Sequence, residues 1–372
     1  MATFHRTTDI PTAGARALPR RYYASPELFG EEMEKIFARR WLCAGREHRV
    51  SAPGDFVVVE AAGESIIITR DPSGTLRAFY NVCRHRGSRL CETSHGNFPG
   101  HIQCPYHAWT YALDGHLLGA PSSDAIDDFD RDDWPLHALS VASWEGFLFI
   151  CLDDAPVPFH EAFAPLIGRF ARWGLPSLGV GRTIEYDVAA NWKLILQNYS
   201  ECYHCAPVHP ALARLTPPTS GENDLVDGPF LGGFMMLNAG SESLTMSGRA
   251  CGVPVGDLPA EDHRRVYYYS IFPNLLLSLH PDYVMAHTLW PLSAGRTRIV
   301  CEWLFHPDSL ADARWNPDDA VAFWERTNRE DWHICEQSQL GVMSRKYVPG
   351  PYSRRESLSA AVDREVLRAL GV

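Results

Sequence analysis

Two histidines in the segment 198–210 have the spacing of a metal site. His204 and His209 are five residues apart, which on a straight helix would place them about 140° apart around the axis. They therefore cannot share one helical face. Pro207 and Pro210 offer a solution, because the residue before a proline avoids the helical region. We expect the helix to end shortly after His204, so that His209 can turn back towards it.

Two histidines and one carboxylate form the facial triad that holds non-haem Fe(II) and leaves positions open for O2 and water. Glu201 is the nearest carboxylate, three residues before His204 and on the same helical face. It could be an iron ligand, or it could orient His204 through a hydrogen bond. Asn198 is a further candidate catalytic residue. The spacing alone does not distinguish this site from an ordinary histidine pair.

A second group pairs one cysteine with one histidine on each of two segments. Cys83 precedes His85 by two residues, Cys104 precedes His107 by three, and 18 residues separate the segments. Tetrahedral zinc accepts such ligands, although zinc ligands more often come in like pairs. A Rieske [2Fe–2S] centre instead holds one iron with two cysteines and the other with two histidines. Both interpretations stay open on spacing alone.

The remaining cysteines are expected to be structural. We find no apolar signal region among residues 1–21, so we expect a cytoplasmic protein whose ten cysteines are mostly reduced. Cys91 and His95 lie between the two Cys/His segments and are expected to be structural. Cys202 and Cys205 form a Cys-x2-Cys pair, which we expect to be small packed residues rather than a redox site.

Short β-rich runs position the first group, and a mixed region positions the second. The runs predict an all-β module over 41–155, with the other domain made of 1–40 and 156–372. Glycines at 87 and 100 are expected to allow tight loops around a bulky cluster. Four runs then predict an antiparallel sheet over 265–305. The clearest strands of the all-β module are 56–59, 65–69, 76–80 and 146–150.

Four segments have helical patterns. The strongest is 316–341, where Asn-Pro-Asp-Asp provides a cap, a proline in the first turn and early negative charge. Segment 22–40 shows amphipathic spacing, segment 161–173 has a helical pattern, and 191–205 would carry the first histidine pair. A net charge of −11 argues against nucleic acid or an anionic membrane as a partner.

The segments resemble a known family. Asn-Val-Cys-Arg-His-Arg-Gly at 81–87 and Cys-Pro-Tyr-His-Ala-Trp at 104–109 resemble the Rieske domain of the Rieske non-haem iron oxygenases, large (alpha) subunit. Asn-Trp-Lys at 191–193 with 201–210 resembles their iron-binding helix. The implied fold is α+β, an all-β Rieske domain plus a helix-grip (START-like) catalytic domain with a large antiparallel sheet and long helices. The implied [2Fe–2S] ligands are Cys83, His85, Cys104 and His107.

The resemblance also completes the mononuclear iron site. Its carboxylate matches Asp331, 122 residues after His209, which with His204 would hold Fe(II). Asp331 lies on the predicted 316–341 helix, on one face with Asn328 and Trp324; Glu330 and Glu336 are the fallback ligands. A further implication of the family concerns Glu201, which would transfer electrons between His204 and His107 of the partner subunit in a cyclic homotrimer.

The implied reaction uses O2 and electrons to oxidise a small molecule. No Gly-x-Gly-x-x-Gly follows a predicted strand, so NAD(P)H would act only through a separate flavin or iron–sulfur reductase, with or without a ferredoxin. Segments 273–283 and 301–305 resemble glycine betaine, stachydrine and choline monooxygenases, which hydroxylate quaternary ammonium compounds. Aromatic faces bind such cations. Candidate aromatic residues are Phe234, Tyr267, Tyr268, Tyr269, Tyr283, Trp290 and Trp324.

Two alternatives remain beside N-demethylation or hydroxylation of a betaine-like compound. The first is ring hydroxylation or O- or N-demethylation of an aromatic substrate in an apolar pocket. The second is an iron–sulfur electron-transfer protein without oxygenase activity, which would need only the Cys/His module. About 220 further residues argue against that second alternative.

Overall fold

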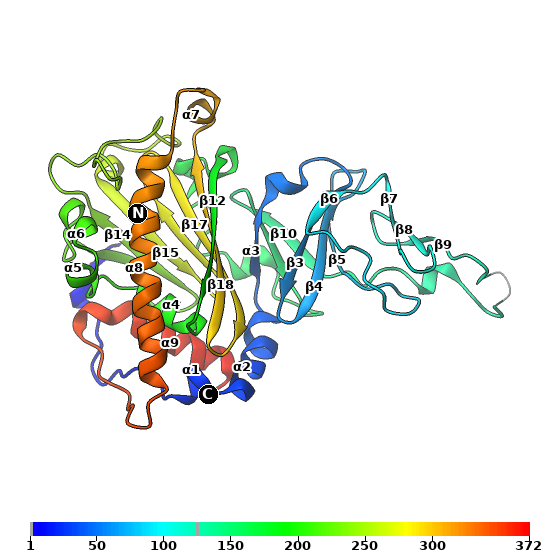
Figure 1. Ribbon diagram of the computed structural model, residues 1–372, viewed down its shortest axis with the longest axis horizontal. Helices are drawn as coiled ribbons and strands as arrows, with labels where there is room; N and C mark the ends of the chain where they lie inside the picture. The colour runs from blue at the N-terminus through cyan, green and yellow to red at the C-terminus, as the bar shows by residue number, and fades with distance from the viewer. Residues whose placement is uncertain (1–2, 124–125) are drawn as a thin grey trace. The chain divides into compact units, whose positions relative to one another are not determined.

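The structure of the protein is a computed structural model that describes residues 3–123 and 126–372 (Figure 1). Residues 1–2 and 124–125 fall within the predicted domains and lie outside the described residues. No helix of the described ranges is both long enough and apolar enough to cross a membrane.

The chain forms two compact units. One consists of Met1–Glu32 and Ala164–Val372, and the other of Met33–Phe163. The predicted domain limits, 41–155 against the rest of the chain, stay a prediction. Each unit is considered by itself below.

The unit Met33–Phe163 is built from three small antiparallel sheets, as the β-rich runs predict. Strand β4 (Glu64–Arg70) buries Ile66, Ile67 and Ile68 completely, which is typical of β-branched residues in a sheet core. The first sheet has the order β5 (Leu76–Tyr80), β4 (Glu64–Arg70), β3 (Asp55–Ala61) and β6 (His95–Asn97). The second has the order β7 (His101–Gln103), β8 (Thr110–Ala112) and β9 (Leu117–Gly119). The third has the order β10 (Ser140–Trp144), β11 (Phe147–Cys151) and β2 (Leu42–Arg46).

The other unit is organised around an eight-stranded antiparallel sheet. Four of its strands confirm the runs predicted over 265–305. Its order is β1 (His5–Arg6), β13 (Glu222–Leu225), β14 (Phe230–Met236), β15 (Arg265–Ile271), β16 (Leu275–Leu279), β17 (Val284–Ser293), β18 (Arg296–Phe305) and β12 (Gly179–Val188).

Three helices pack on one face of this sheet: α4 (Trp192–Tyr199), α8 (Asp318–Val342) and α9 (Ser357–Leu370). Figure 1 shows α8, in orange, running along the sheet. The asparagine start signal of α8 is confirmed, because Asn316 Oδ1 accepts a hydrogen bond of 2.8 Å from the Asp318 amide. A shorter helix, α7 (Pro307–Ala311), precedes it.

Two predicted helices are interrupted. Segment 22–40 forms α1 (Arg21–Ala24), α2 (Pro26–Glu32) and a π-helical turn over Met33–Phe37, at the border of the two units. Segment 161–173 is mostly not α-helical, and the prediction was wrong there. Only α3 (Phe159–Ala162) and a 3-10 turn at Ala171–Trp173 form. Pro165 lacks an amide donor, and Gly168 has φ +75°, which a helix cannot contain.

Helix α4 is fixed from its far side by buried polar contacts. Lys193 Nζ donates to Glu32 at 2.6 Å, and the Trp192 indole donates to the same carboxylate at 2.8 Å. Gln197 donates to the Tyr23 hydroxyl at 2.9 Å. Burial lowers the pKa of Lys193 to about 8, although Glu32 opposes the shift. These contacts hold the helix whose other end leads into the predicted metal site.

Candidate metal centres

His204, His209 and Asp331 are brought together by the fold. Their ligand atoms all lie within 4.8 Å of one another, and no other group of this kind occurs among the described residues. Asp331 Oδ1 is 2.9 Å from Nε2 of His209 and 3.3 Å from Nε2 of His204. Both imidazoles thus present Nε2 to the same carboxylate oxygen.

The local fold that achieves this differs from the predicted helix 191–205. Helix α4 already ends at Tyr199, because the Glu201 carboxylate accepts hydrogen bonds from the Tyr203 and His204 amides. A side chain that bonds nearby amides competes with the helical pattern. His204 therefore lies in a turn beyond the helix.

The two prolines act differently from our expectation. Pro207 lies within the short helix α5 (Cys205–Val208), and Pro210 begins α6 (Pro210–Leu215). A proline in the first turn loses no helical hydrogen bond, so it starts a helix readily. His209 lies between these helices with φ −120° and ψ 67°, and this break turns its side chain towards His204.

A second carboxylate holds the opposite nitrogen of each imidazole. His204 Nδ1 is 2.6 Å from Glu201 Oε1, and His209 Nδ1 is 2.8 Å from Glu330 Oε2. A carboxylate at Nδ1 fixes the tautomer that leaves the Nε2 lone pair for a metal ion. Glu201 and Glu330, both considered above as ligands, are therefore placed behind the histidines.

The electrostatics favour positive charge at this point. Burial works against a charged His204, but hydrogen bonds to Asp331 and Glu201 raise its pKa to about 10. Burial also opposes ionisation of Asp331, yet bonds from the two histidines lower its pKa to about 2. Two nitrogens and one carboxylate facing one another fit a divalent iron, and the arrangement leaves other coordination positions open.

Helix α8 supplies the carboxylate and part of the pocket wall. Trp324, Thr327 and Asp331 all line the cavity beside the histidines, as the shared helical face predicts for Trp324. Asn328 lies elsewhere, bonded to the Tyr186 hydroxyl at 3.3 Å. The fallback ligand Glu336 accepts from the Ala189 amide at 3.0 Å, away from the site.

Asn198 and a cysteine pair also border the histidines. Asn198 Nδ2 is 3.4 Å from Nε2 of His204. Cys202 and Cys205 form a disulfide with a Cα–Cα distance of 4.9 Å, so the prediction of two reduced, packed residues was wrong. The turns on either side of His204 bring the two residues within disulfide range. The other eight cysteines, all among the described residues, form no disulfide.

A cavity of about 610 Å³ adjoins the three candidate ligands. Of the seven aromatic residues proposed from the sequence, Phe234, Tyr268 and Trp324 line it. Strand alternation explains part of this selection, since Tyr268 faces the cavity while its neighbours in β15 point to the other face of the sheet. There Tyr267 packs on Trp173 with ring centroids 5.1 Å apart.

Sequence reasoning missed one aromatic lining residue. Tyr199, the last residue of α4, lines the cavity, with ring centroids 6.1 Å from Tyr268. Its hydroxyl lies 2.8 Å from the Ser278 hydroxyl, which fixes the ring. The ring centroid of Tyr268 in turn lies 6.4 Å from that of Trp324. The signal was available, because Tyr199 lies within the histidine segment 198–210 itself.

The Cys/His segments form two matching loops in the unit Met33–Phe163, called the β unit below. The Cys83 amide donates to the Ser88 carbonyl at 2.8 Å, and the Cys104 amide donates to the Trp109 carbonyl at 2.8 Å. The fourth residue after each cysteine has a left-handed backbone, Gly87 with φ +72° and Ala108 with φ +56°. The prediction for Gly87 is confirmed. Gly100 also has a left-handed backbone, with φ +87°, in the turn before β7, and Ala108 takes the position in the second loop that is equivalent to Gly87.

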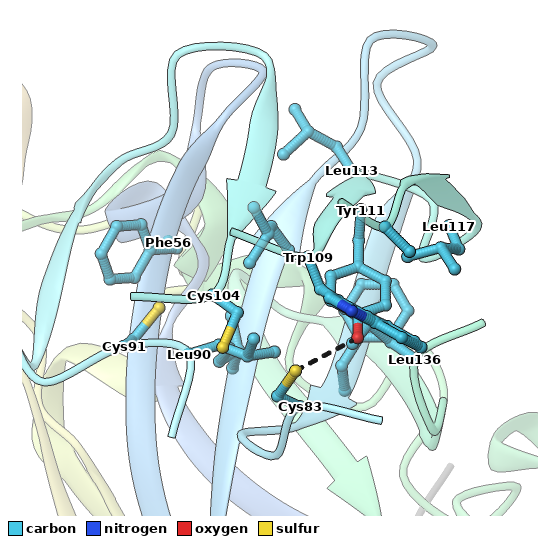
Figure 2. Packing of buried hydrophobic residues seen from close by; sticks show 14 residues of the cluster. Phe56, Cys83, Leu90, Cys91, Cys104, Trp109, Tyr111, Leu113, Leu117 and Leu136 are labelled. Carbon is cyan, nitrogen blue, oxygen red and sulfur yellow. Dashed lines mark hydrogen bonds between the residues drawn. The ribbon is translucent and has the colours of Figure 1, made fainter. Parts of the chain in front are cut away.

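The two cysteines of these loops are buried in the core of the β unit, whereas the two histidines lie nearer its surface. Figure 2 shows Cys83 and Cys104 on neighbouring loops, both within the apolar cluster, with a dashed line from Cys83 to Tyr111. The Cys83 sulfur is 3.4 Å from the Tyr111 hydroxyl, and burial raises the pKa of the Cys83 thiol. His85 and His107 lie near the surface, with ring centroids 4.7 Å apart.

These donors fit a two-iron cluster better than a single ion. Among the described residues, no three of these four bring their ligand atoms within 4.8 Å of one another. A tetrahedral zinc ion would need all four ligand atoms that close together. His107 Nδ1 is buried and has no hydrogen-bond partner, so a free lone pair is available there. Cys91 belongs to the apolar cluster, as expected for a structural cysteine.

Comparisons with known proteins find matches to both regions of the chain that carry these residues. Residues 175–371 match the family model "Ring hydroxylating alpha subunit (catalytic domain)", and residues 40–130 match "Rieske [2Fe-2S] domain". The chain is 32% identical to the glycine betaine monooxygenase oxygenase subunit of Chromohalobacter salexigens, over 92% of this chain and 82% of that one.

Two further comparisons extend this result. The carnitine monooxygenase oxygenase subunit of Acinetobacter baumannii is 38% identical over 54% of each chain. The structure of a quaternary ammonium Rieske monooxygenase, described for carnitine oxidation by gut microbiota and inter-subunit electron transfer, superimposes with a TM-score of 0.78 at 25% identity, covering 99% of both chains.

Proposed function

The chain belongs to the Rieske non-haem iron oxygenases as an alpha subunit, and on this premise we propose that it oxidises an N-methyl or adjacent carbon of a betaine-like quaternary ammonium compound. Membership brings a [2Fe–2S] cluster and a mononuclear iron. The observation that carries the substrate proposal is the aromatic lining beside the candidate iron ligands, formed by Tyr199, Tyr268 and Trp324.

We assign the ligands from the geometry. His204, His209 and Asp331 would hold the mononuclear iron through two imidazole nitrogens and one carboxylate oxygen. When bound, this iron supplies the O2 chemistry, and the cluster supplies single electrons. Glu201 and Glu330 keep both imidazoles in the ligating tautomer. The cluster ligands would be Cys83, His85, Cys104 and His107.

The aromatic faces suit a cation that carries no hydrogen-bond donor. A trimethylammonium group cannot form an ion pair with directed N–H bonds, but it is attracted to the negative faces of aromatic rings. Tyr199 and Tyr268 are held by the fold, and Trp324 donates its indole N–H at 2.6 Å to the Tyr283 hydroxyl, so its ring orientation is fixed. Such rings would place a methyl group near the iron.

Electrons must reach this site from outside the chain. Oxidation of one N-methyl group consumes one O2, two electrons and two protons, inserts one oxygen atom into a C–H bond and releases one water. Loss of formaldehyde from the product would complete N-demethylation. We propose that a separate NAD(P)H-dependent reductase supplies the electrons, and that Glu201 links His204 to His107 of the partner subunit in a homotrimer.

The comparisons favour this substrate class over the two alternatives. The relatives above are named for glycine betaine and carnitine, not for aromatic compounds. A protein that only transfers electrons would not need the catalytic domain matched at residues 175–371.

A substrate screen tests the proposal. Purified protein with a surrogate reductase would be given betaines or small aromatic compounds, and O2 uptake and formaldehyde would be followed together. We expect substrate-dependent O2 uptake with stoichiometric formaldehyde from a betaine. Turnover of aromatic compounds alone would contradict the proposed substrate class, while an unchanged iron content after His204→Ala would contradict the iron assignment.

A further inference from the structure

Two arginines line the cavity beside the candidate iron ligands. Arg6 comes from β1, and Arg355 comes from the 3-10 turn Arg354–Glu356 that precedes α9. Neither guanidinium forms an ion pair with a carboxylate of the described residues. Elsewhere in the same unit arginines do find such partners, as Arg172 does with Asp262.

Arg355 is held in place without being neutralised. Its Nη2 donates to the carbonyl oxygens of Cys202 at 3.3 Å and of Pro218 at 3.0 Å. Its backbone is fixed by a capping box in which the Ser353 amide donates to Glu356 at 2.8 Å. Two carbonyl dipoles orient the guanidinium but leave its full charge. The remaining N–H groups of the planar fork are free to bind an anion.

Arg6 contributes a weaker positive charge. It lies at the surface and is paired across the strands with Glu222, which also lines the cavity. These two side chains are not within ion-pair distance of one another, yet Glu222 reduces the net field of Arg6. Arg355 is half-buried and forms no ion pair with a carboxylate of the described residues, so it is the stronger anion-binding group.

The cavity thus combines two chemistries. One set of walls presents the aromatic residues Tyr199, Tyr268 and Trp324, which suit a cation. The other presents unneutralised guanidinium groups, which bind carboxylates through paired N–H donors. A ligand with only a positive charge would meet Arg355 unfavourably, and a simple anion would leave the aromatic walls without a cation to bind.

We propose that Arg355, assisted by Arg6, binds the carboxylate of a zwitterionic substrate, so that this enzyme selects betaines over quaternary ammonium alcohols. The inference rests on the proposed function, because it assumes that the cavity receives the quaternary ammonium group. It adds the second recognition element, which determines which members of that class are accepted.

Glycine betaine and choline test this proposal. Both carry a trimethylammonium group, but choline has an alcohol in place of the carboxylate. KM and kcat would be measured with each compound for the wild type and for Arg355→Met, Arg355→Lys and Arg354→Met. Arg354 is exposed, neighbours Arg355 in sequence and does not line the cavity, so it is the matched control.

We expect the wild type to prefer glycine betaine. Arg355→Met should raise KM for glycine betaine by about 10- to 100-fold, the usual effect of losing hydrogen bonds to a charged group. It should change KM for choline by less than about 2-fold, and Arg355→Lys should be intermediate because a point charge replaces the fork. Arg354→Met should leave both values unchanged.

Other outcomes separate the two proposals. An equal loss with both compounds would mean that Arg355 only supports the loops at Cys202 and Pro218, and the inference would be overturned. Equal turnover of both compounds by the wild type would overturn it too, while the proposed function would stand. Turnover of neither by the wild type would overturn the proposed function and the inference with it.

Arg6→Met provides a second variant if Arg355→Met does not fold. The Arg6 side chain bridges no loops by hydrogen bonds among the described residues, so its removal should not disturb them. We expect KM for glycine betaine to rise, by less than with Arg355→Met, and KM for choline to stay the same or fall. A rise for both compounds would contradict the carboxylate assignment.

Discussion

The two candidate metal centres of this chain are built in opposite ways. The Cys/His centre uses two copies of one local loop, in which each cysteine amide bonds to a carbonyl five residues later. The mononuclear centre joins a broken helical segment to a residue 122 positions away on α8. The first is a repeated local structure, whereas the second exists only after the sheet and helices have packed.

Their polar surroundings differ as well. The buried end of the Cys/His centre has one hydroxyl, that of Tyr111, near the sulfur of Cys83. The mononuclear centre has a carboxylate behind each imidazole, Glu201 and Glu330. A cluster that exchanges electrons needs a tuned potential, which hydrogen bonds to sulfur adjust. A site that binds O2 needs histidines fixed in the ligating tautomer, and carboxylates provide that.

Removing the long-range ligand should separate the two centres most strongly. Asp331→Ala deletes the one candidate ligand that α8 contributes among the described residues, so we expect iron to fall from about three to about two per chain and oxygenation to be lost. The loops of the other unit do not depend on α8, so the visible absorption and the reduced-state EPR signal of the cluster should persist. Iron analysis and EPR on the same sample measure both.

The matched control for this variant is Glu336→Gln. Glu336 lies on the same helix and bonds to the Ala189 amide, outside the site. It should retain about three irons. If Asp331→Ala also retains three, the carboxylate has been assigned to the wrong residue.

Glu201 tests whether the centres work as a pair. Glu201→Gln keeps an oxygen that can accept from His204 but removes the charge, so both metals should stay bound. If Glu201 carries electrons between subunits, coupled turnover should fall by about 100-fold while each centre keeps its own spectrum. Single-turnover measurements would show unchanged reduction of the cluster and slowed electron transfer from the cluster to the iron.

Full activity of Glu201→Gln would refute the bridging role. Loss of mononuclear iron in this variant would show instead that Glu201 acts mainly by holding His204. The two outcomes are distinguished by iron content alone.

The contrast between the centres explains what could be predicted from the sequence. Cys83, His85, Cys104 and His107 stand out because their loops are local and their spacing is set by the loop itself. Asp331 could be placed only through the family resemblance, since no spacing rule connects residues 122 positions apart. The helix end at Tyr199 was missed because it depends on the side chain of Glu201, which competes with the backbone.

The pocket was still less predictable. Strand alternation separates Tyr268 from Tyr267, but only packing shows which face of β15 meets the helices. The charge of Arg355 in the cavity depends on the approach of the turn before α9 to the loops at Cys202 and Pro218. Such contacts join segments that are more than a hundred residues apart, and periodicity contains no information about them.

Glu330 provides a smaller test of the same contrast. It accepts from Nδ1 of His209 and is itself held by Arg326 at 3.0 Å. Glu330→Ala should lower the affinity of the mononuclear site for iron by about tenfold, as loss of a histidine-orienting carboxylate usually does, and Glu330→Gln should lower it less. Iron titration of the metal-depleted protein measures this affinity. An unchanged affinity in both variants would show that the buried ring of His209 is oriented by packing alone.

The smallest effects should come from the matching loops themselves. Gly87 and Ala108 occupy equivalent positions with left-handed backbones, so exchanging their residue types should act in opposite directions. Gly87→Ala adds a Cβ that meets no protein atom within 4 Å, and it should destabilise the β unit by about 1 kcal/mol through backbone conformation alone. Ala108→Gly should relieve the same strain and stabilise the unit by up to about 1 kcal/mol.

Thermal unfolding followed at the cluster absorption would show shifts of roughly 3 °C with opposite signs. Two shifts of the same sign would mean that the loops are not equivalent, and the repeated local construction of this centre would be disproved.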